Sequence, residues 1–403
     1  MARHGPAIPR YKAVAAPALL QQGFRPFFLG AGLWAVVAMV LWIWHLSGTT
    51  VLPQGLPQGL PLGLSPFAWH ANALIFGYGS AALAGFLLTA IPNWTGRMPL
   101  QGASLAALAG LWLAGRGAVL AFDGLGLALA ASIDAAFLLV LWGVIAREIA
   151  AGRNWRNLPV LAAVGVFALA HVLFWLGVAG RVPVGLGERL GIAVLVLLIG
   201  LVGGRIVPSF TRNWLKKQGA TAFPAPTGKL DRVLLPGTVV ALIAWVAAPT
   251  HPVTSALCAL AALGHAWRLS HWRGLATWRE PLLLVLHLGY AWLPVGLALV
   301  ALTPVVPAIT ESLALHALTA GAIATMTLAV MTRATRGHTG RALTADRGTV
   351  LVFLAVTLSA LARLAAPLWP SGYLPLLQIS GGLWIAAFLL FALIYAPLLC
   401  RRR

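Results

Sequence analysis

Uncharged apolar stretches about 20 residues long recur along the chain, and this pattern constrains the fold more than any other feature. The hydrocarbon core of a bilayer is about 30 Å thick, and a helix that rises about 1.5 Å per residue crosses it in about 20 residues. Lipid offers no hydrogen-bond partners, so the backbone groups of each span have to be paired within a helix. The sequence therefore predicts an all-α, polytopic integral membrane protein.

Charged residues and Pro/Gly clusters divide the apolar sequence into about twelve predicted transmembrane helices. Together they predict a single transmembrane domain over 25–397, between a cytoplasmic N-terminal segment, 1–24, and a basic cytoplasmic tail, 398–403. The uncharged Pro/Gly-rich segment 47–65 is expected to be a loop outside the membrane. The predicted spans are 25–46, 66–92, 100–122, 124–147, 158–179, 187–208, 232–249, 252–269, 281–303, 312–333, 348–368 and 374–397.

The composition excludes a soluble protein, because only 9% of the residues are charged and 60% are hydrophobic, whereas soluble domains have about 25% charged residues. A net charge of +20 would suggest nucleic-acid binding in a soluble chain. Here the basic residues are dispersed between apolar runs, which is typical of residues that set topology and contact anionic lipid. Membrane lipid is the expected partner, and nucleic acid is not.

The distribution of basic residues predicts the orientation of the helices. Of the 28 Lys and Arg residues, all but four fall in gaps on one side of the predicted membrane, the exceptions being Arg116, Arg181, Arg189 and Arg363. Basic residues collect on the cytoplasmic side. Both termini are therefore expected in the cytoplasm, in agreement with an even number of spans.

A weak internal repeat relates the second, sixth and tenth predicted helices. Their cytoplasmic ends read IPNWTGR, VPSFTRN and AVMTRAT, and each places a Thr (Thr95, Thr211, Thr332) near a basic residue. This pattern suggests three four-helix units in which these three helices are equivalent. The alternative is that unrelated helix exits use the same Pro, Thr and Arg residues.

Ten histidines are the main candidates for metal ligands, since the predicted spans contain almost no carboxylates. The predicted topology places His70 about one turn below the outer edge of one helix, and His316 at almost the same depth on another. Two intramembrane imidazoles on separate helices at one depth are what the axial positions of a b-type haem require. The alternative for each is a buried histidine that only makes a hydrogen bond.

His171 and His287 form a reserve pair of candidate cofactor-binding residues. His171 is predicted about two turns from the outer end of its helix, and His287 about two turns from the cytoplasmic side. Their depths differ by roughly 10 Å at 1.5 Å per residue, so each is expected to serve a separate centre. His70, His316 and His287 are the candidate metal ligands of the chain.

Five arginines lie at the cytoplasmic boundary within short polar-aromatic motifs: Arg25, Arg97, Arg205, Arg212 and Arg333. Arg donors beside Trp and Phe are suited to holding an anionic group. The more common use of such residues is to anchor helices at the interface and to cap helix C-termini.

Several stretches resemble the NnrS family: GFRPFFL, WHANALIFGYGSAALAGFLLTAIPNWTGR (69–97), LIGLVGGRIVPSFTRNWL (198–215), LHLGYAWLPVG (286–296) and LHALTAGAIATMTLAVMTRATRGHTGRALTA (315–345). The resemblance implies a twelve-span bacterial inner-membrane protein that contains haem and copper. It also implies a link to the nitric-oxide response of denitrifying bacteria and to tolerance of nitrosative stress. His70, His287, His316 and His338 fall on motif positions of the family.

The chain departs from the family in one motif of the second helix. The family motif commonly reads Trp-His-Ala-His-Glu, whereas this chain has Asn72 and Ala73 in place of the second His and the Glu. Asn is a poor copper ligand, so haem b is the expected cofactor and copper at this motif is in doubt. The twelve spans also resemble the haem–copper oxidase core, but its copper-binding histidines have no counterpart here, so oxygen reduction is not expected.

These features favour a haem-binding inner-membrane protein in nitric-oxide metabolism or nitrosative-stress defence, either redox-active or NO-binding, with nitric oxide and a redox partner as expected partners. A secondary transporter of a small solute is the alternative, because repeats and polar residues at mid-membrane also suit alternating access. The scarcity of carboxylates in the spans argues against coupling to protons or sodium. A third possibility is a scaffold for a redox partner, without activity of its own.

Overall fold

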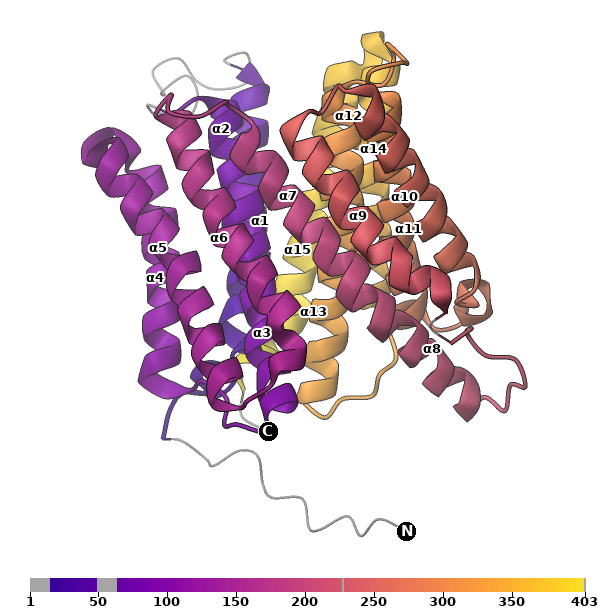
Figure 1. The fold of residues 1–403 in the computed structure, drawn as a ribbon. Coiled ribbons are helices and arrows are strands. Elements are labelled where there is room, and N and C mark those ends of the chain that lie inside the picture. Colours follow the sequence, from indigo (N-terminus) through magenta and orange to yellow (C-terminus); the bar gives the residue numbers. More distant parts are fainter. Residues whose placement is uncertain (1–14, 49–63, 227, 402–403) are drawn as a thin grey trace.

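The computed structural model describes residues 15–48, 64–226 and 228–401, and these residues form a bundle of long helices without strands (Figure 1). The prediction of an all-α polytopic membrane protein is confirmed. Most of the predicted cytoplasmic segment 1–24 and of the predicted outer loop 47–65 lies outside the described residues, as do the last two residues of the tail.

Twelve long helical stretches follow one another along the described chain. Nine contain no π-helical segment: α1 (Phe24–Leu46), α4 (Gly102–Leu120), α5 (Phe122–Ala151), α6 (Leu158–Val178), α9 (Lys229–Ala247), α10 (Pro252–Ser270), α11 (Pro281–Leu302), α14 (Arg347–Ala365) and α15 (Tyr373–Cys400). Of these, α5 is kinked at Gly126, whose backbone is not helical. The other three contain a π-helical segment each: α2 (Pro66–Ala71), η3 (Asn72–Gly79) and α3 (Ser80–Thr95); α7 (Leu186–Leu198), η5 (Ile199–Gly203) and α8 (Gly204–Lys217); α12 (Glu311–His316), η7 (Ala317–Ile323) and α13 (Ala324–His338).

Within the described residues, 11 helical stretches are long and apolar enough to cross a membrane. They cover every predicted span except 252–269, where α10 lies. This helix carries His265 and Arg268, which are 0% and 5% exposed and take part in an internal polar network described below. These two polar residues therefore face the interior of the bundle. They also lower the mean hydropathy of α10, so this helix is not among the 11 stretches selected by length and composition.

Helices that follow one another pack as neighbours, as α4 does on α5, α6 on α7, α10 on α11 and α14 on α15, and α1 packs against α15. Small residues permit the closest approaches, as in other membrane bundles. Gly187 of α7 is an example, because a Cβ atom there would collide with the backbone of Phe174 on α6. One continuous apolar core runs through the bundle from Phe24 to Leu399.

The three helices with π-helical segments are the second, sixth and tenth of the chain, the same three that the sequence repeat relates. All three begin at the end of the bundle where α2 and α12 are labelled in Figure 1. Because π-helical turns are rare, their presence in these three helices supports the equivalence of the three units. The threonines align only in part: Thr211 and Thr332 each lie six residues before the end of their helix, whereas Thr95 is the last residue of α3.

Candidate functional site

Two imidazole rings from different helices face each other at the α2–α12 end of the bundle. The rings of His70, in α2, and His316, at the end of α12, have centroids 6.5 Å apart and planes 19° apart. The structure therefore brings together the two histidines that the sequence places at one depth. Their role as ligands stays a prediction.

The ring nitrogens of this pair have unused hydrogen-bonding capacity. Nδ1 of His316 donates to the carbonyl oxygen of Ser312 at 2.6 Å, which fixes the tautomer and leaves Nε2 with a free lone pair. Nδ1 of His70 is buried and has no hydrogen-bond partner among the described residues. Metals bind neutral imidazole through a nitrogen lone pair, so His70 and His316 are the residues that would hold a haem at this place.

Aromatic and basic side chains surround the histidine pair. Trp42 of α1 stacks on His70 with ring centroids 4.2 Å apart, and the ring centroid of His45 lies 5.9 Å from that of Trp42. On the α12 side, Nη2 of Arg363 donates to the hydroxyl of Ser312 at 2.8 Å. The sequence argument missed Trp42, His45 and Arg363. Trp42 and His45 are three residues apart on one helix, and this spacing puts both on one face.

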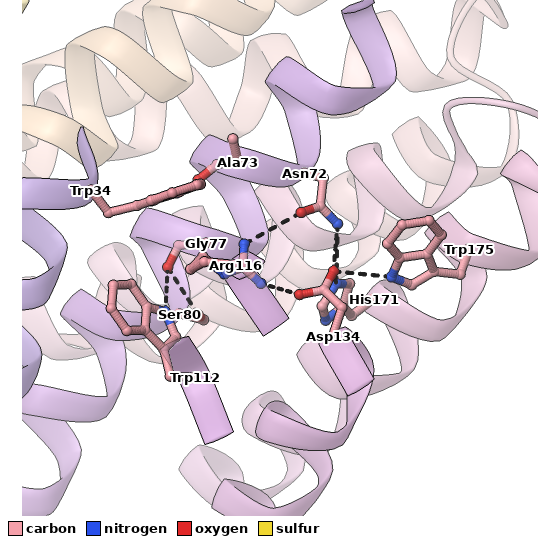
Figure 2. Close-up of polar contacts among 10 residues, drawn as sticks. All are labelled: Trp34, Asn72, Ala73, Gly77, Ser80, Trp112, Arg116, Asp134, His171 and Trp175. Carbon is pink, nitrogen blue, oxygen red and sulfur yellow. Dashed lines mark hydrogen bonds and ion pairs between the residues drawn. The ribbon is translucent and has the colours of Figure 1, made fainter. Parts of the chain in front are cut away.

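A buried polar network lies beside the pair, with the carboxylate of Asp134 on α5 at its centre (Figure 2). Asp134 is fully buried, and one of its oxygens, Oδ1, forms an ion pair with Arg116 of α4, which is 3% exposed. The other oxygen, Oδ2, accepts three hydrogen bonds, from Asn72 Nδ2 at 2.8 Å, His171 Nε2 at 2.9 Å and Trp175 Nε1 at 3.1 Å. The network thus joins the second, third, fourth and fifth long helices of the chain.

Asp134 was not among the site residues predicted from the sequence, because carboxylates are scarce in the predicted spans. A signal was present, because adjacent apolar spans contain one acidic and one basic residue, Asp134 and Arg116, and intramembrane charges usually pair. A buried ion pair is tolerable only when its remaining lone pairs are hydrogen-bonded, and Asp134 meets this condition. The arrangement is that of a structural tie between helices.

The network also engages two residues that the sequence argument singled out. His171 uses Nε2 to bond Asp134, and its ring stacks on Phe76 with centroids 4.3 Å apart. Asn72 donates its amide to Asp134, and its oxygen accepts from Arg116 at 3.3 Å. The Asn72 amide is engaged and is a poor copper ligand, so Asn72 does not fit copper at this altered motif. Nε2 of His171 is also engaged, whereas its Nδ1 is buried without a hydrogen-bond partner among the described residues.

The π-helical segment η3 shapes the wall of this network. Its wider turns free backbone carbonyls for side-chain donors: Ala73 O accepts from Trp34 Nε1 at 2.8 Å, and Gly77 O from Trp112 Nε1 at 3.0 Å. A Cβ atom on Gly77 would lie 2.5 Å from both Arg116 Nη1 and Trp34 Nε1. Glycine at this position therefore makes room for the buried guanidinium.

A second buried network occupies the other half of the molecule, around α9, α10 and α11. The ring of His265 is hydrogen-bonded on both sides, to Tyr290 at 2.8 Å and to Thr238 at 3.0 Å. Arg268 donates to the Tyr290 hydroxyl at 3.1 Å and pairs with Asp231 at 2.6 Å. The sequence argument did not identify this group, whose members are dispersed over three predicted helices.

His287 lies near the second network, apart from His171. Its Nε2 is hydrogen-bonded to Thr211 at 2.9 Å, and its Nδ1 is buried without a hydrogen-bond partner among the described residues. The two reserve histidines thus belong to two different surroundings. In the part of the chain that the structure describes, no group of three or more His, Cys, Asp or Glu residues is arranged to hold a metal ion. The family-motif residue His338 packs against Phe24, with ring centroids 5.5 Å apart.

The boundary arginines behave mainly as caps and anchors. Nη1 of Arg25 donates to two carbonyls at the C-terminal end of α15, at 2.8 and 2.9 Å, which satisfies groups that a helix end leaves open. Arg212 donates to the carbonyl of Pro224 at 2.7 Å, and Arg333 lies over the ring of Phe210 at 4.4 Å. These contacts favour the anchoring interpretation over an anion clamp.

Comparison with known protein families gives a match to the NnrS protein family over residues 18–403, nearly the whole chain. The chain belongs to the NnrS family. Membership of this family fits a role in the response to nitric oxide, and NnrS proteins are in general metal-binding membrane proteins. The histidine pair and the Asp134 network therefore lie in an NnrS protein whose second helix carries Asn72. No curated protein matches the chain.

Proposed function

We propose that this NnrS protein binds a b-type haem through His70 and His316 and acts in nitric-oxide metabolism or in defence against nitrosative stress. The observation that carries the proposal is the facing of these two rings, from separate helices, with centroids 6.5 Å apart. Nδ1 of His70 is also left without a hydrogen-bond partner among the described residues. A haem with two imidazole ligands supplies one-electron chemistry. Membership of the NnrS family supports the link to nitric oxide.

The residues of the chain have distinct parts in this proposal. Ser312 holds the ring of His316 through its carbonyl, and the stacking of Trp42 limits the rotation of His70. Arg363 adds a positive charge next to the pair, through Ser312, and such a charge favours anionic groups of a bound ligand. The proposed location is the bacterial inner membrane with both termini in the cytoplasm, and the proposed partner is an electron donor or acceptor.

The transporter alternative receives less support. Asp134 supplies the intramembrane carboxylate that the sequence seemed to lack, but its two oxygens already take an ion pair and three hydrogen bonds. A coupling carboxylate has to gain and lose a proton or an ion during transport. The saturation of Asp134 makes that role unfavourable.

The visible spectrum of the purified, haem-supplied protein tests the proposal. We expect a six-coordinate low-spin spectrum that is lost, or converted to high spin, in His70→Ala and in His316→Ala. His265→Ala is the matched control, because it removes a buried imidazole that is hydrogen-bonded through both ring nitrogens. A normal spectrum in both variants of the pair, together with its loss in His287→Ala, would place the haem in the other half of the protein and overturn the proposal.

A further inference from the structure

A small apolar cavity of about 90 Å³, partly open and not fully enclosed, lies among the three helices with π-helical segments. Its wall consists of residues from 79–87 on η3 and α3, from 195–206 on α7, η5 and α8, and from 323–331 on η7 and α13. On each helix the lining residues are three or four positions apart, so each presents one continuous stripe. The three repeat-related helices thus surround one shared space.

The wall of this cavity offers almost no polar group to a ligand. Its one polar side chain is Thr327, whose hydroxyl is bonded to the backbone carbonyl of Ile323 at 2.6 Å and to the hydroxyl of Tyr78. A water molecule needs two to four polar partners, and cavities without them stay dry and accept benzene or xenon, as an engineered cavity of about 150 Å³ does. This smaller space suits a smaller, uncharged and apolar occupant.

The cavity has a defined position relative to the histidine pair. Its lining begins nine residues after His70 on the second helix and seven residues after His316 on the tenth. At 1.5 Å per residue this is about 10–14 Å deeper along the same two helices. The cavity therefore lies deeper in the bundle than the histidine pair, along the same two helices.

We propose that this cavity is a binding site for a small uncharged apolar molecule of the size of a diatomic gas. The identity of the natural occupant as nitric oxide rests on the proposed function, whereas the capacity to hold an apolar gas rests on the cavity alone. An empty cavity lowers the stability of the folded protein in proportion to the cavity volume, and an apolar occupant would offset this cost.

Xenon provides a probe that does not depend on haem. We expect structures of the full-length protein under xenon pressure to contain xenon within the cavity, next to Leu83 and Met326. Val202→Phe fills the cavity and should abolish this occupancy, whereas Val240→Phe, the same change at a side chain that is 53% exposed on α9, should leave it unchanged. Leu83→Ala enlarges the space and should increase the occupancy.

Two results would overturn the inference. One is wild-type protein without xenon in the cavity, or with a lipid or detergent chain there instead. The other is occupancy that Val202→Phe and Leu83→Ala leave unchanged; if Val202→Phe does not fold, Leu83→Ala still decides. Haem spectra of the same samples separate the two proposals: xenon binding without a low-spin haem rejects the proposed function alone, and a low-spin haem without xenon rejects the cavity site alone.

Discussion

His70 and Asn72 are two residues apart on one helix, yet they belong to regions with opposite chemistry. Residues at this spacing point to different sides of a helix, so His70 faces His316 while Asn72 faces the carboxylate of Asp134. Around Asp134, both carboxylate oxygens are engaged. In the histidine pair, Nδ1 of His70 has no hydrogen-bond partner in the part of the chain that the structure describes. Nδ1 of His171 and Nε of Arg116 in the Asp134 network also have no hydrogen-bond partner among the described residues. An unpartnered nitrogen therefore does not by itself mark a ligand site, and what sets the histidine pair apart is that two imidazole rings from separate helices face each other.

The largest expected effect comes from breaking the ion pair in the Asp134 network. Asp134→Asn leaves the guanidinium of Arg116 buried without its charge partner, which should lower the free energy of unfolding by about 3–5 kcal/mol. Reversible denaturation of the purified protein in mixed micelles measures this change in the free energy of unfolding. The double variant Arg116→Met, Asp134→Asn removes both charges but keeps an amide oxygen that can accept from the donors on Asn72, His171 and Trp175, and it should recover part of the loss. A single variant as stable as the wild type would show that the network is not a structural tie.

A smaller effect is expected from His171, at the edge of the same network. His171→Phe keeps the stacking on Phe76 but removes one of three hydrogen bonds to Asp134 Oδ2. Hydrogen bonds to charged groups contribute about 1.5–3 kcal/mol, and the unfolding free energy should fall by about this amount or less. The haem spectrum should stay unchanged. Loss of the spectrum in a folded variant would move His171 from the structural region to the ligand region.

An exposed ion pair provides the reference for these buried contacts. Partial burial raises the pKa of Asp346, but the hydrogen bonds from Thr349 and Arg336 and the charge of Arg336 outweigh it, so its pKa lies below the ordinary 3.8. The stabilisation from Asp346 is therefore present above pH 3.8 and is lost as the pH falls below this value. Asp346→Asn should cost about 0.2–1 kcal/mol at neutral pH, as exposed pairs do, and less in acid.

Melting temperatures of wild type and Asp346→Asn across this pH range measure the difference. Because Asn can still accept the hydrogen bond of the helix N-terminus, the variant isolates the charge. A difference that grows as the pH falls would contradict the sign of this linkage.

The fold was predictable because the length of apolar runs is set by the thickness of the bilayer and hardly depends on packing. Even α10 was predicted from its apolar stretch, although its polar residues distinguish it from the other helices. The π-helical segments were not predictable. They depend on donors from other helices, such as Trp34 and Trp112, which take up the carbonyls that the wider turns release.

Contacts in the candidate site could be predicted where they depend on the depth of a residue in the membrane. Contacts that depend on the rotation of a helix about its axis could not be predicted. His70 and His316 could be paired from topology alone, because few other polar side chains lie at the same depth to serve as partners. Asp134 and His171 could not, since span boundaries give depth but not the direction in which a side chain points. Their meeting requires α5 and α6 to turn particular faces toward η3.

Substitution within the histidine pair is expected to change the stability least, and it tests the contrast with the Asp134 network most strictly. His70→Phe keeps an aromatic ring to stack on Trp42 and removes the buried Nδ1 atom that has no partner among the described residues. Replacing an unsatisfied polar group by an apolar one of similar shape is nearly neutral or stabilising. We therefore expect the haem-free variant to unfold within about 0.5 kcal/mol of the wild type, while the low-spin haem spectrum is lost. A large loss of stability without haem would mean that His70 holds the fold together as Asp134 does, and the contrast between the two regions would fail.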